Sequence, residues 1–202
     1  MIRYIGKIPR EVTIACSGGI DSMVITDFLL KGKRKVNLAY FNHDTMHSKD
    51  AEQFVKQYAN SKNLKLVIGR VKGIKGRRSL EEFWRDERYD FFNSIGSKFI
   101  ITCHHLGDAV ETWLWSACHG NPKLIPYQRS ENIFRPFLLT SKASIKNYAT
   151  SKNVKWIEDP SNMSTNFTRN SIRHNMMPHV LKVNPGIKKT IYKKMLALYK
   201  DV

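Results

Sequence analysis

The chain has 202 residues, of which 34 are Lys or Arg and 17 are Asp or Glu, so its formal net charge is +17. Hydrophobic residues make up 42% of it, as in ordinary folded domains, and no apolar run approaches the roughly 20 residues that cross a bilayer. These values exclude a membrane-spanning protein. The excess of Lys and Arg predicts a polyanionic partner, although drift toward lysine in an AT-rich genome would give a similar balance.

The N-terminus and the cysteines indicate the compartment. Residues 1–10 carry charges but no apolar core with a cleavage site behind it, so no signal or transit peptide is recognisable. Cys16, Cys103 and Cys118 form no CxxC pair, which argues against a disulfide framework and against a zinc or iron–sulfur site. We therefore expect a cytoplasmic protein with reduced cysteines.

Strand and helix patterns alternate through the first half of the chain. Strands are predicted at 11–16, 36–42, 64–71 and 98–102, and helices at 23–31, 48–61, 79–94 and 106–118. The third helix opens on a capping box at Ser79 and follows a basic, glycine-containing loop at 72–78. This alternation predicts an α/β fold with a parallel sheet and helices on both of its faces.

The second half is less regular. A loop with a short strand near Ile133 and Phe134 precedes a helix at 141–151, an extended piece at 154–157 and a turn-rich stretch at 159–166. Two basic helices, at about 169–182 and 185–199, follow. We expect residues 1–140 to form a nucleotide-binding domain, and 141–202 to complete the same catalytic domain with a basic helical extension.

The turn between the first strand and first helix has the composition of a phosphate cradle. Its sequence is SGGIDS, residues 17–22. Glycines let successive backbone N–H groups converge on an anion, and the following helix contributes its positive end. The turn lacks the GK[ST] of the Walker loop, and the plain alternative is an ordinary strand-to-helix turn. We expect ATP to contact Ser17, Gly18, Gly19, Asp21 and Ser22.

Five segments in order resemble the tRNA(Ile)-lysidine synthetases, a family of the PP-loop ATP pyrophosphatase superfamily with a Rossmann-like, adenine nucleotide alpha hydrolase-like fold. They are SGGIDS at 17–22, FNHD at 41–44, EEFWRDERYDFF at 81–92, CHHLGDAVET at 103–112 and WIEDPSNMSTNFTRNSIRH at 156–174. The resemblance implies a ligase that uses ATP and Mg²⁺ to join free L-lysine to C2 of the wobble cytidine in an isoleucine tRNA with a CAU anticodon. An adenylated cytidine would be the intermediate, and AMP and pyrophosphate would be released.

Acids and arginines at helical spacing are the expected catalytic groups. Asp108 and Glu111 are three residues apart, so they share a helix face and could hold or deprotonate an ammonium group; the alternative is that they complement the helix dipole. The resemblance also places an arginine from each of two helices near lysine and ATP. By motif position we select Arg85, rather than Arg88, and Arg173, rather than Arg169, with solvated helix faces as the alternative.

Further contacts are expected at the ends of the strands, where open α/β sheets bind ligands. Asp21 is the expected contact for Mg²⁺ or for the substrate amine. Asn42 and His43 end the second strand, and one histidine of the pair His104 and His105 is expected to face the phosphates. Zinc is rejected, because three adjacent residues at a strand end cannot all face one ion.

The chain departs from the family pattern in two ways. Gly107 stands where the family usually has an aspartate, which would weaken metal or amine binding. Many relatives also continue into C-terminal domains that hold the tRNA, whereas this sequence ends at Val202. The resemblance therefore implies a short form, with tRNA held by the 72–78 loop, by the closing helices with Lys188, Lys189, Lys193 and Lys194, or by a second subunit in a homodimer.

Two other functions stay open. Related PP-loop enzymes thiolate tRNA and would need paired catalytic cysteines, for which Cys103 and Cys118 are available. A non-catalytic chain that only binds tRNA is the second alternative. It has no need to keep Asp21, Asp108, Glu111 and Arg173 together, and we therefore favour the enzyme.

Overall fold

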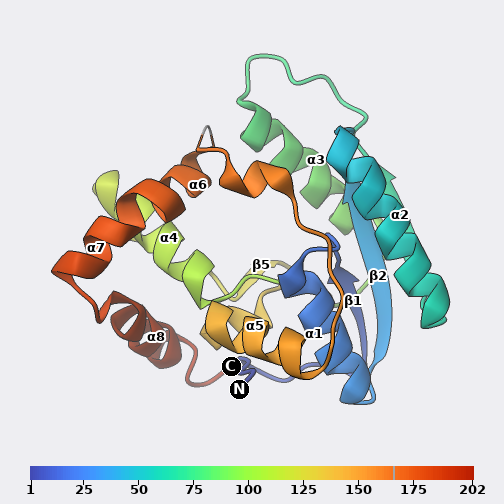
Figure 1. The fold of residues 1–202 in the computed structure, drawn as a ribbon, viewed down its shortest axis with the longest axis horizontal. Helices are drawn as coiled ribbons and strands as arrows, with labels where there is room; N and C mark the ends of the chain where they lie inside the picture. Colours follow the sequence, from blue (N-terminus) through green and yellow to red (C-terminus); the bar gives the residue numbers. More distant parts are fainter. Residues whose placement is uncertain (166) are drawn as a thin grey trace.

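The computed structural model describes residues 1–165 and 167–202, which fold around a six-stranded sheet (Figure 1). The strand order is β3-β2-β1-β4-β6-β5. The strands are β1 (Glu11–Ala15), β2 (Lys35–Asn42), β3 (Leu66–Arg70), β4 (Ile100–Thr102), β5 (Gln128–Ser130) and β6 (Ile133–Phe134). All neighbouring pairs are parallel except β5 with β6, so the predicted parallel sheet is confirmed with one antiparallel edge strand that the sequence patterns did not indicate.

The first four helices each begin after a turn that follows a strand. They are α1 (Ile20–Lys31), α2 (Met46–Ser61), α3 (Leu80–Ser94) and α4 (Leu106–Cys118). The rest of the helical structure is η1 (Pro136–Leu139), α5 (Lys142–Ser151), η2 (Pro160–Met163), α6 (Thr168–Ser171), η3 (Ile172–Met176), α7 (Met177–Val183) and α8 (Ile187–Leu198). Every helix expected from the sequence is present, and no helix end differs from the expected one by more than three residues.

Successive side chains of each strand point to opposite faces of the sheet, so each face has its own buried cluster. Ile14 of β1 packs with α1, α2 and α5 in one buried cluster, whereas Ala39 of β2 packs with Tyr89 and Phe92 of α3 in another. Ile101 and its neighbour Ile100 in β4 divide in the same way. Helices therefore cover both faces, as predicted.

The order of the strands creates a crevice beside β1. The chain runs outward from β1 through β2 to β3 and then returns to place β4 on the other side of β1. Ala15 pairs with Thr102 at the carboxyl ends of β1 and β4. Loops that leave two neighbouring strands in opposite directions separate there, which is where open α/β sheets bind ligands.

A second core joins the C-terminal helices to α4. Val110 of α4, Leu138 of η1 and Ile191 of α8 are all buried in it. The helix expected at 169–182 is compound, because α6 continues through a π-helical turn, η3, into α7. Pro178 has no N–H to offer the carbonyl of residue 174, and its ring would clash with that carbonyl, which explains the wider turn before it.

Candidate active site

The SGGIDS turn forms an anion cradle at the carboxyl end of β1. Gly18 has a φ of +80°, and a Cβ atom there would lie 3.1 Å from Ile157 Cγ2. The Gly19 N–H donates to Ser17 Oγ (3.3 Å), and Ser22 Oγ donates to the Gly19 carbonyl (2.9 Å). No side chain caps the N-terminus of α1. The first N–H groups of α1 are thus left for a ligand, and a helix N-terminus favours an anion.

The segment expected to be extended at 154–157 closes one side of this cradle. It has no regular strand, but the Ile157 N–H donates to the Gly18 carbonyl at 3.0 Å. Trp156 and Ile157 both line the cleft. A segment 139 residues away in sequence, counted from Gly18 to Ile157, therefore shapes the turn, which the sequence patterns alone did not indicate.

A cleft of about 800 Å³ extends from the cradle across the carboxyl ends of the strands. Most of the expected site residues line it, namely Ser17, Gly19, Asp21, Ser22, His43, His104, Asp108 and Arg173. Gly18, Asn42, Arg85 and Glu111 are not among its lining residues. Asn42 is buried, and its side chain donates to Glu52 Oε2 (2.7 Å) and accepts from the Asp44 N–H (2.7 Å), so it shapes the end of β2.

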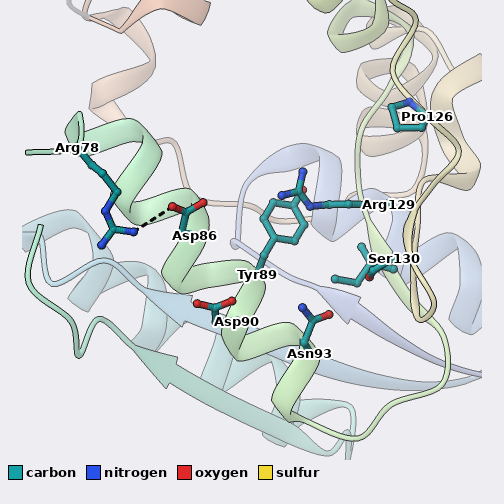
Figure 2. Close-up of a pocket in the computed structure, with 9 residues that line it drawn as sticks. Arg78, Asp86, Tyr89, Asp90, Asn93, Pro126, Arg129 and Ser130 are labelled. Atoms are coloured by element: carbon teal, nitrogen blue, oxygen red, sulfur yellow. Dashed lines mark hydrogen bonds and ion pairs between the residues drawn. The ribbon is translucent and has the colours of Figure 1, made fainter.

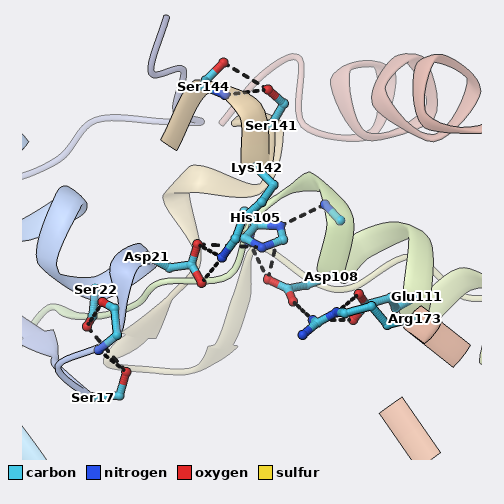
Figure 3. Close-up of polar contacts among 12 residues, drawn as sticks. Ser17, Asp21, Ser22, His105, Asp108, Glu111, Ser141, Lys142, Ser144 and Arg173 are labelled. Carbon is cyan, nitrogen blue, oxygen red and sulfur yellow. Dashed lines mark hydrogen bonds and ion pairs between the residues drawn. The ribbon is translucent and has the colours of Figure 1, made fainter. Parts of the chain in front are cut away.

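Asp21 is held by a lysine that the motifs did not reveal. Lys142, at the start of α5, places its Nζ 2.6 Å from Oδ1 and 2.7 Å from Oδ2 of Asp21 (Figure 3). Both residues line the cleft. The ammonium group therefore lies beside the anion cradle. The position of α5 against α1 makes this contact, and 121 residues separate the two side chains in sequence.

The two expected acids meet two arginines. Arg173 donates from Nε to Oε1 of Glu111 at 2.7 Å and from Nη2 to Oε2 of Glu111 at 3.0 Å. Arg169 places Nε 3.1 Å from Glu111 Oε2 and Nη2 3.3 Å from Asp108 Oδ1. Such bidentate geometry is strong and directional. The network joins α4 to the α6–η3 segment. It includes Arg169, although motif position favoured Arg173 over Arg169 as the catalytic arginine.

Asp108 has two roles. Its Oδ2 accepts the N–H of His105 at 2.7 Å and so caps α4, which was the plain alternative for this acid. Burial would raise the pKa of Asp108, but the charge of Arg169 and the hydrogen bond from the backbone N–H of His105 outweigh burial and hold the pKa well below its usual range. Asp108 therefore stays ionised at neutral pH, and it is suited to holding a cation rather than to accepting a proton.

His105 connects the cradle to the acids. Its Nδ1 accepts the Gly107 N–H at 2.9 Å, so the hydrogen of the neutral ring is on Nε2, which faces Asp21 Oδ1 at 3.7 Å (Figure 3). A Cβ atom at Gly107 would lie 2.6 Å from His105 Cε1. The glycine that departs from the family pattern is thus the residue that lets this imidazole lie over the first turn of α4.

The other two histidines border the cleft in neutral form. His104 places Nδ1 3.0 Å from Thr102 Oγ1, and burial lowers its pKa well below the usual value. Burial, followed by the charge of Arg88, lowers the pKa of His43 to about 4. His43 packs between Phe41 and Trp84, with ring centroids 5.0 Å and 5.2 Å away. It therefore lines the cleft as a neutral aromatic ring rather than as a cation.

Helix α3 presents Arg88, and not Arg85, to the cleft. Arg88 is partly buried and lines the cleft, while Arg85 is exposed. The role predicted for Arg85 thus has no support from contact with the cleft, although the two guanidinium groups are close enough for Arg85 to disfavour the charge on Arg88. The spacing of the two arginines could not distinguish them, because they lie one turn apart on one face.

The cleft fits a magnesium ion only together with phosphate ligands. Among the described residues, no three His, Cys, Asp or Glu side chains converge to form a metal site. Mg²⁺ usually takes one or two carboxylates and completes its shell with substrate phosphates and water. Asp21 supplies one carboxylate beside the cradle, which suits that mode of binding.

A phosphate cradle at the crevice of an open α/β sheet, beside an acid–arginine network, is typical of a nucleotide-binding α/β protein. The model of the PP-loop domain matches residues 4–180, and the chain belongs to this family. Among the described residues, no helix is both long and apolar enough to cross a membrane.

The chain is also similar in sequence to curated tRNA(Ile)-lysidine synthases. The chain is 36% identical to the tRNA(Ile)-lysidine synthase of Persephonella marina over 193 residues, which cover 88% of this chain and 43% of the relative. It is 31% identical to that of Thermotoga maritima, covering 91% of this chain and 48% of the relative. The chain thus spans less than half the length of these curated relatives.

Two solved structures share the fold. The U34-tRNA thiolase NcsA from Methanococcus maripaludis, with its 4Fe–4S cluster, superposes with a TM-score of 0.72 at 17% identity, covering 95% of this chain and 73% of that one. The NH3-dependent NAD synthetase from Campylobacter jejuni superposes with a TM-score of 0.53 at 14% identity, covering 95% and 86%. At these identities the likeness concerns the fold alone.

Proposed function

We propose that this chain is a tRNA(Ile)-lysidine synthetase domain, which joins lysine to C2 of the wobble cytidine in an isoleucine tRNA with a CAU anticodon. The observation that carries the proposal is that Asp108, Arg169 and Arg173 line the same cleft as the phosphate cradle. Both arginines also pair with the buried Glu111, and His105 lies between Asp21 and Asp108. Relatives named tRNA(Ile)-lysidine synthase match about 90% of the chain.

The cradle end of the cleft would bind ATP. The cytosine C2 oxygen attacks the α-phosphorus, and the bond to pyrophosphate breaks. The N-terminus of α1 and the Lys142 ammonium would stabilise the charge that develops on the departing pyrophosphate, since both present positive charge to the cradle. Asp21 would hold a Mg²⁺ ion, which would help to neutralise the negative charge of the phosphates. Asn42 would act only by shaping the end of β2.

The network end would bind lysine. The ε-ammonium group first loses a proton to solvent, because the amine must attack C2 in its neutral form. The C2–O bond to AMP then breaks, and the attacking nitrogen releases a second proton to solvent. Once its ε-amine is neutral, a bound lysine carries one ammonium and one carboxylate group, so it can exchange with the existing pairs between the two acids and two arginines without leaving a net charge buried. Arg173 or Arg169 would take its carboxylate, and Asp108 or Glu111 would take its α-ammonium.

The decisive experiment supplies the chain with ATP, Mg²⁺, labelled lysine and an unmodified CAU isoleucine tRNA. Label should appear at the wobble cytidine, and one pyrophosphate should be released for each lysine incorporated. A tRNA with uridine at that position should accept no lysine. If neither lysine incorporation nor pyrophosphate release occurs, the proposed activity is wrong.

Thiolation of tRNA is the second candidate, because the thiolase shares the fold. Paired cysteines are not assembled in the cleft, however. Cys103 lines the cleft, whereas Cys118 is exposed at the far end of α4, and both are free. Burial also raises the pKa of the Cys103 thiol well above its usual value, which leaves it a poor nucleophile.

We further propose that the protein acts in the cytoplasm, with a homodimer as one way to extend its tRNA contacts.

A further inference from the structure

A second cleft lies on the other side of Tyr89, outside the site described above. It has a volume of about 610 Å³ and runs between α3 and the β5–β6 edge of the sheet (Figure 2). One face of α3 lines it at helical spacing, through Asp86, Tyr89, Asp90 and Asn93. The opposite wall holds Arg129 and Ser130. Because Tyr89 also lines the active-site cleft, the two clefts are neighbours that share one aromatic side chain. We call this second site the Tyr89 cleft.

Three guanidinium groups surround the ring of Tyr89. Arg129 lies over it with its Cζ 3.7 Å from the ring centroid, and Arg88 lies 5.6 Å away on the side of the active-site cleft. Arg135 donates from Nη2 to the Tyr89 hydroxyl at 3.4 Å and is almost fully buried. Its Nε atom is buried without a hydrogen-bond partner among the described residues.

These arginines lack counter-ions in the described part of the chain. Among the described residues, no Asp or Glu oxygen lies within ion-pair distance of Arg88, Arg129 or Arg135. Two acids line the Tyr89 cleft: Asp86, which is paired with Arg78 at 3.0 Å, and Asp90, which is exposed to solvent. Burial, and then the charges of Arg85 and Arg135, lower the pKa of Arg129 despite the opposing effect of Tyr89. A group of like charges held close together is relieved when an anion binds among them.

The geometry selects among anions. A flat guanidinium stacked on an aromatic ring offers a platform on which a nucleobase can stack, while its edge donates to phosphate oxygens. An acidic peptide would use the charge but not the flat surface. A polynucleotide uses both, and its next phosphate would lie toward Arg78 at the rim of the cleft.

We propose that the Tyr89 cleft binds a nucleotide adjacent to the modified cytidine, with its phosphate on Arg129 and its base stacked over the Arg129–Tyr89 pair. This inference rests on the proposed function for the identity of the RNA. It supplies a tRNA contact within the catalytic domain, distinct from the 72–78 loop and from the lysines of α8.

The test measures binding of a fluorescently labelled RNA hairpin carrying the CAU loop to the 202-residue chain, by anisotropy over a range of salt concentrations. Arg129→Ala should weaken binding about tenfold and lower the slope of log K against log salt by roughly 0.7, as expected for one lost phosphate contact. Arg129→Lys should keep the wild-type slope but bind with intermediate affinity, because lysine keeps the charge and loses the flat stack.

The matched control is Arg10→Ala, which removes the same charge from an exposed residue at the opposite end of β1. It should bind the hairpin like the wild type. Equal binding by Arg129→Ala and Arg10→Ala, or no measurable hairpin binding by the wild type, would overturn the assignment. It would also be overturned if polyglutamate of matched charge displaced the hairpin as well as unlabelled RNA does, or if Arg129→Ala weakened binding of ATP alone and left the hairpin unaffected.

Lysine incorporation by the wild type is measured separately. If incorporation is absent while Arg129→Ala still weakens hairpin binding selectively, the proposed function fails and the Tyr89 cleft remains an RNA site. If incorporation occurs but Arg129→Ala binds the hairpin normally, the function stands and the assignment of this cleft is wrong.

Discussion

The Lys142 ammonium group lies 2.6 Å and 2.7 Å from the two carboxylate oxygens of Asp21, beside the uncapped start of α1. Asp21 is thus not a free carboxylate facing the cleft, and Mg²⁺ or substrate must share it with a cation. Since the Lys142 side chain is 40% exposed, it can turn from Asp21 toward a bound phosphate at little cost. This pair links the N-terminus of α5 to the nucleotide cradle.

Replacing Lys142 with alanine should slow tRNA-dependent pyrophosphate release by about 10²-fold, because one positive charge is lost where the leaving group becomes negative. Stability should change little, since the pair is partly exposed. Lys152→Ala, an exposed change at the end of the same helix, is the control. Pyrophosphate release that proceeds equally fast in both variants would assign Lys142 a purely structural role.

Gly18→Ala should lose ATP binding and about 1–2 kcal/mol of stability, because its φ is +80° and the new methyl group would meet Ile157. Gly120→Ala shares the backbone strain, with a φ of +78°, but its Cβ atom would meet nothing within 4 Å. The control should therefore lose stability and keep ATP affinity. Thermal unfolding and titration with a fluorescent ATP analogue measure the two effects, and equal ATP affinity in the two variants would contradict the cradle.

Arg173→Ala should destabilise the chain by about 1–3 kcal/mol. The side chain of Glu111 is only 6% exposed, and without Arg173 its one remaining ion-pair partner among the described residues would be Arg169. This loss is smaller than the roughly 3–5 kcal/mol for breaking a fully buried ion pair, because the Arg173 side chain is 36% exposed. Urea unfolding measures this change.

Glu111→Ala should reduce lysine transfer more than adenylation, which single-turnover assays of each step can separate. An equal loss in both steps would assign Glu111 to the fold rather than to lysine.

Stability should fall in mild acid through His43. Its pKa is lowered to about 4 in the folded chain from an ordinary 6.5, so the unfolded chain binds the proton more readily. The contribution is fully present above about pH 6.5 and is lost as the pH falls toward about 4, by roughly 1–2 kcal/mol after allowance for partial exposure. His104 acts in the same direction. The free energy of unfolding of His43→Asn should therefore decrease less than that of the wild type across this range, and parallel curves would refute the assignment.

Serine at Cys103 or at Cys118 should leave lysine transfer in place, because neither thiol is placed for sulfur chemistry. Burial raises the pKa of Cys103, and Cys118 lies outside the cleft. The labelled-lysine assay on each single variant and on the double variant tests this. Loss of activity in either single variant, with the fold intact by circular dichroism, would favour the thiolation alternative.

Several features could be predicted from the sequence because they depend on neighbouring residues. The cradle follows from glycines between an apolar strand and a helix, and the alternation of strand and helix patterns predicted both the sheet and the carboxyl edge where the cradle lies. Asp108 and Glu111 share a face because helical spacing requires it. Proposed roles for these groups remain predictions until the experiments above are made.

Only the tertiary structure decided which distant side chains meet the cradle and the acids. Lys142 reaches Asp21 because α5 packs on α1, and Ile157 closes over Gly18 because the segment after α5 returns along the cradle. The packing of α3 distinguishes Arg88 from Arg85, and the missing N–H of Pro178 widens the turn that carries Arg173. Local patterns record the periodicity of one element, whereas these contacts depend on how separate elements pack, which no single stretch of sequence contains.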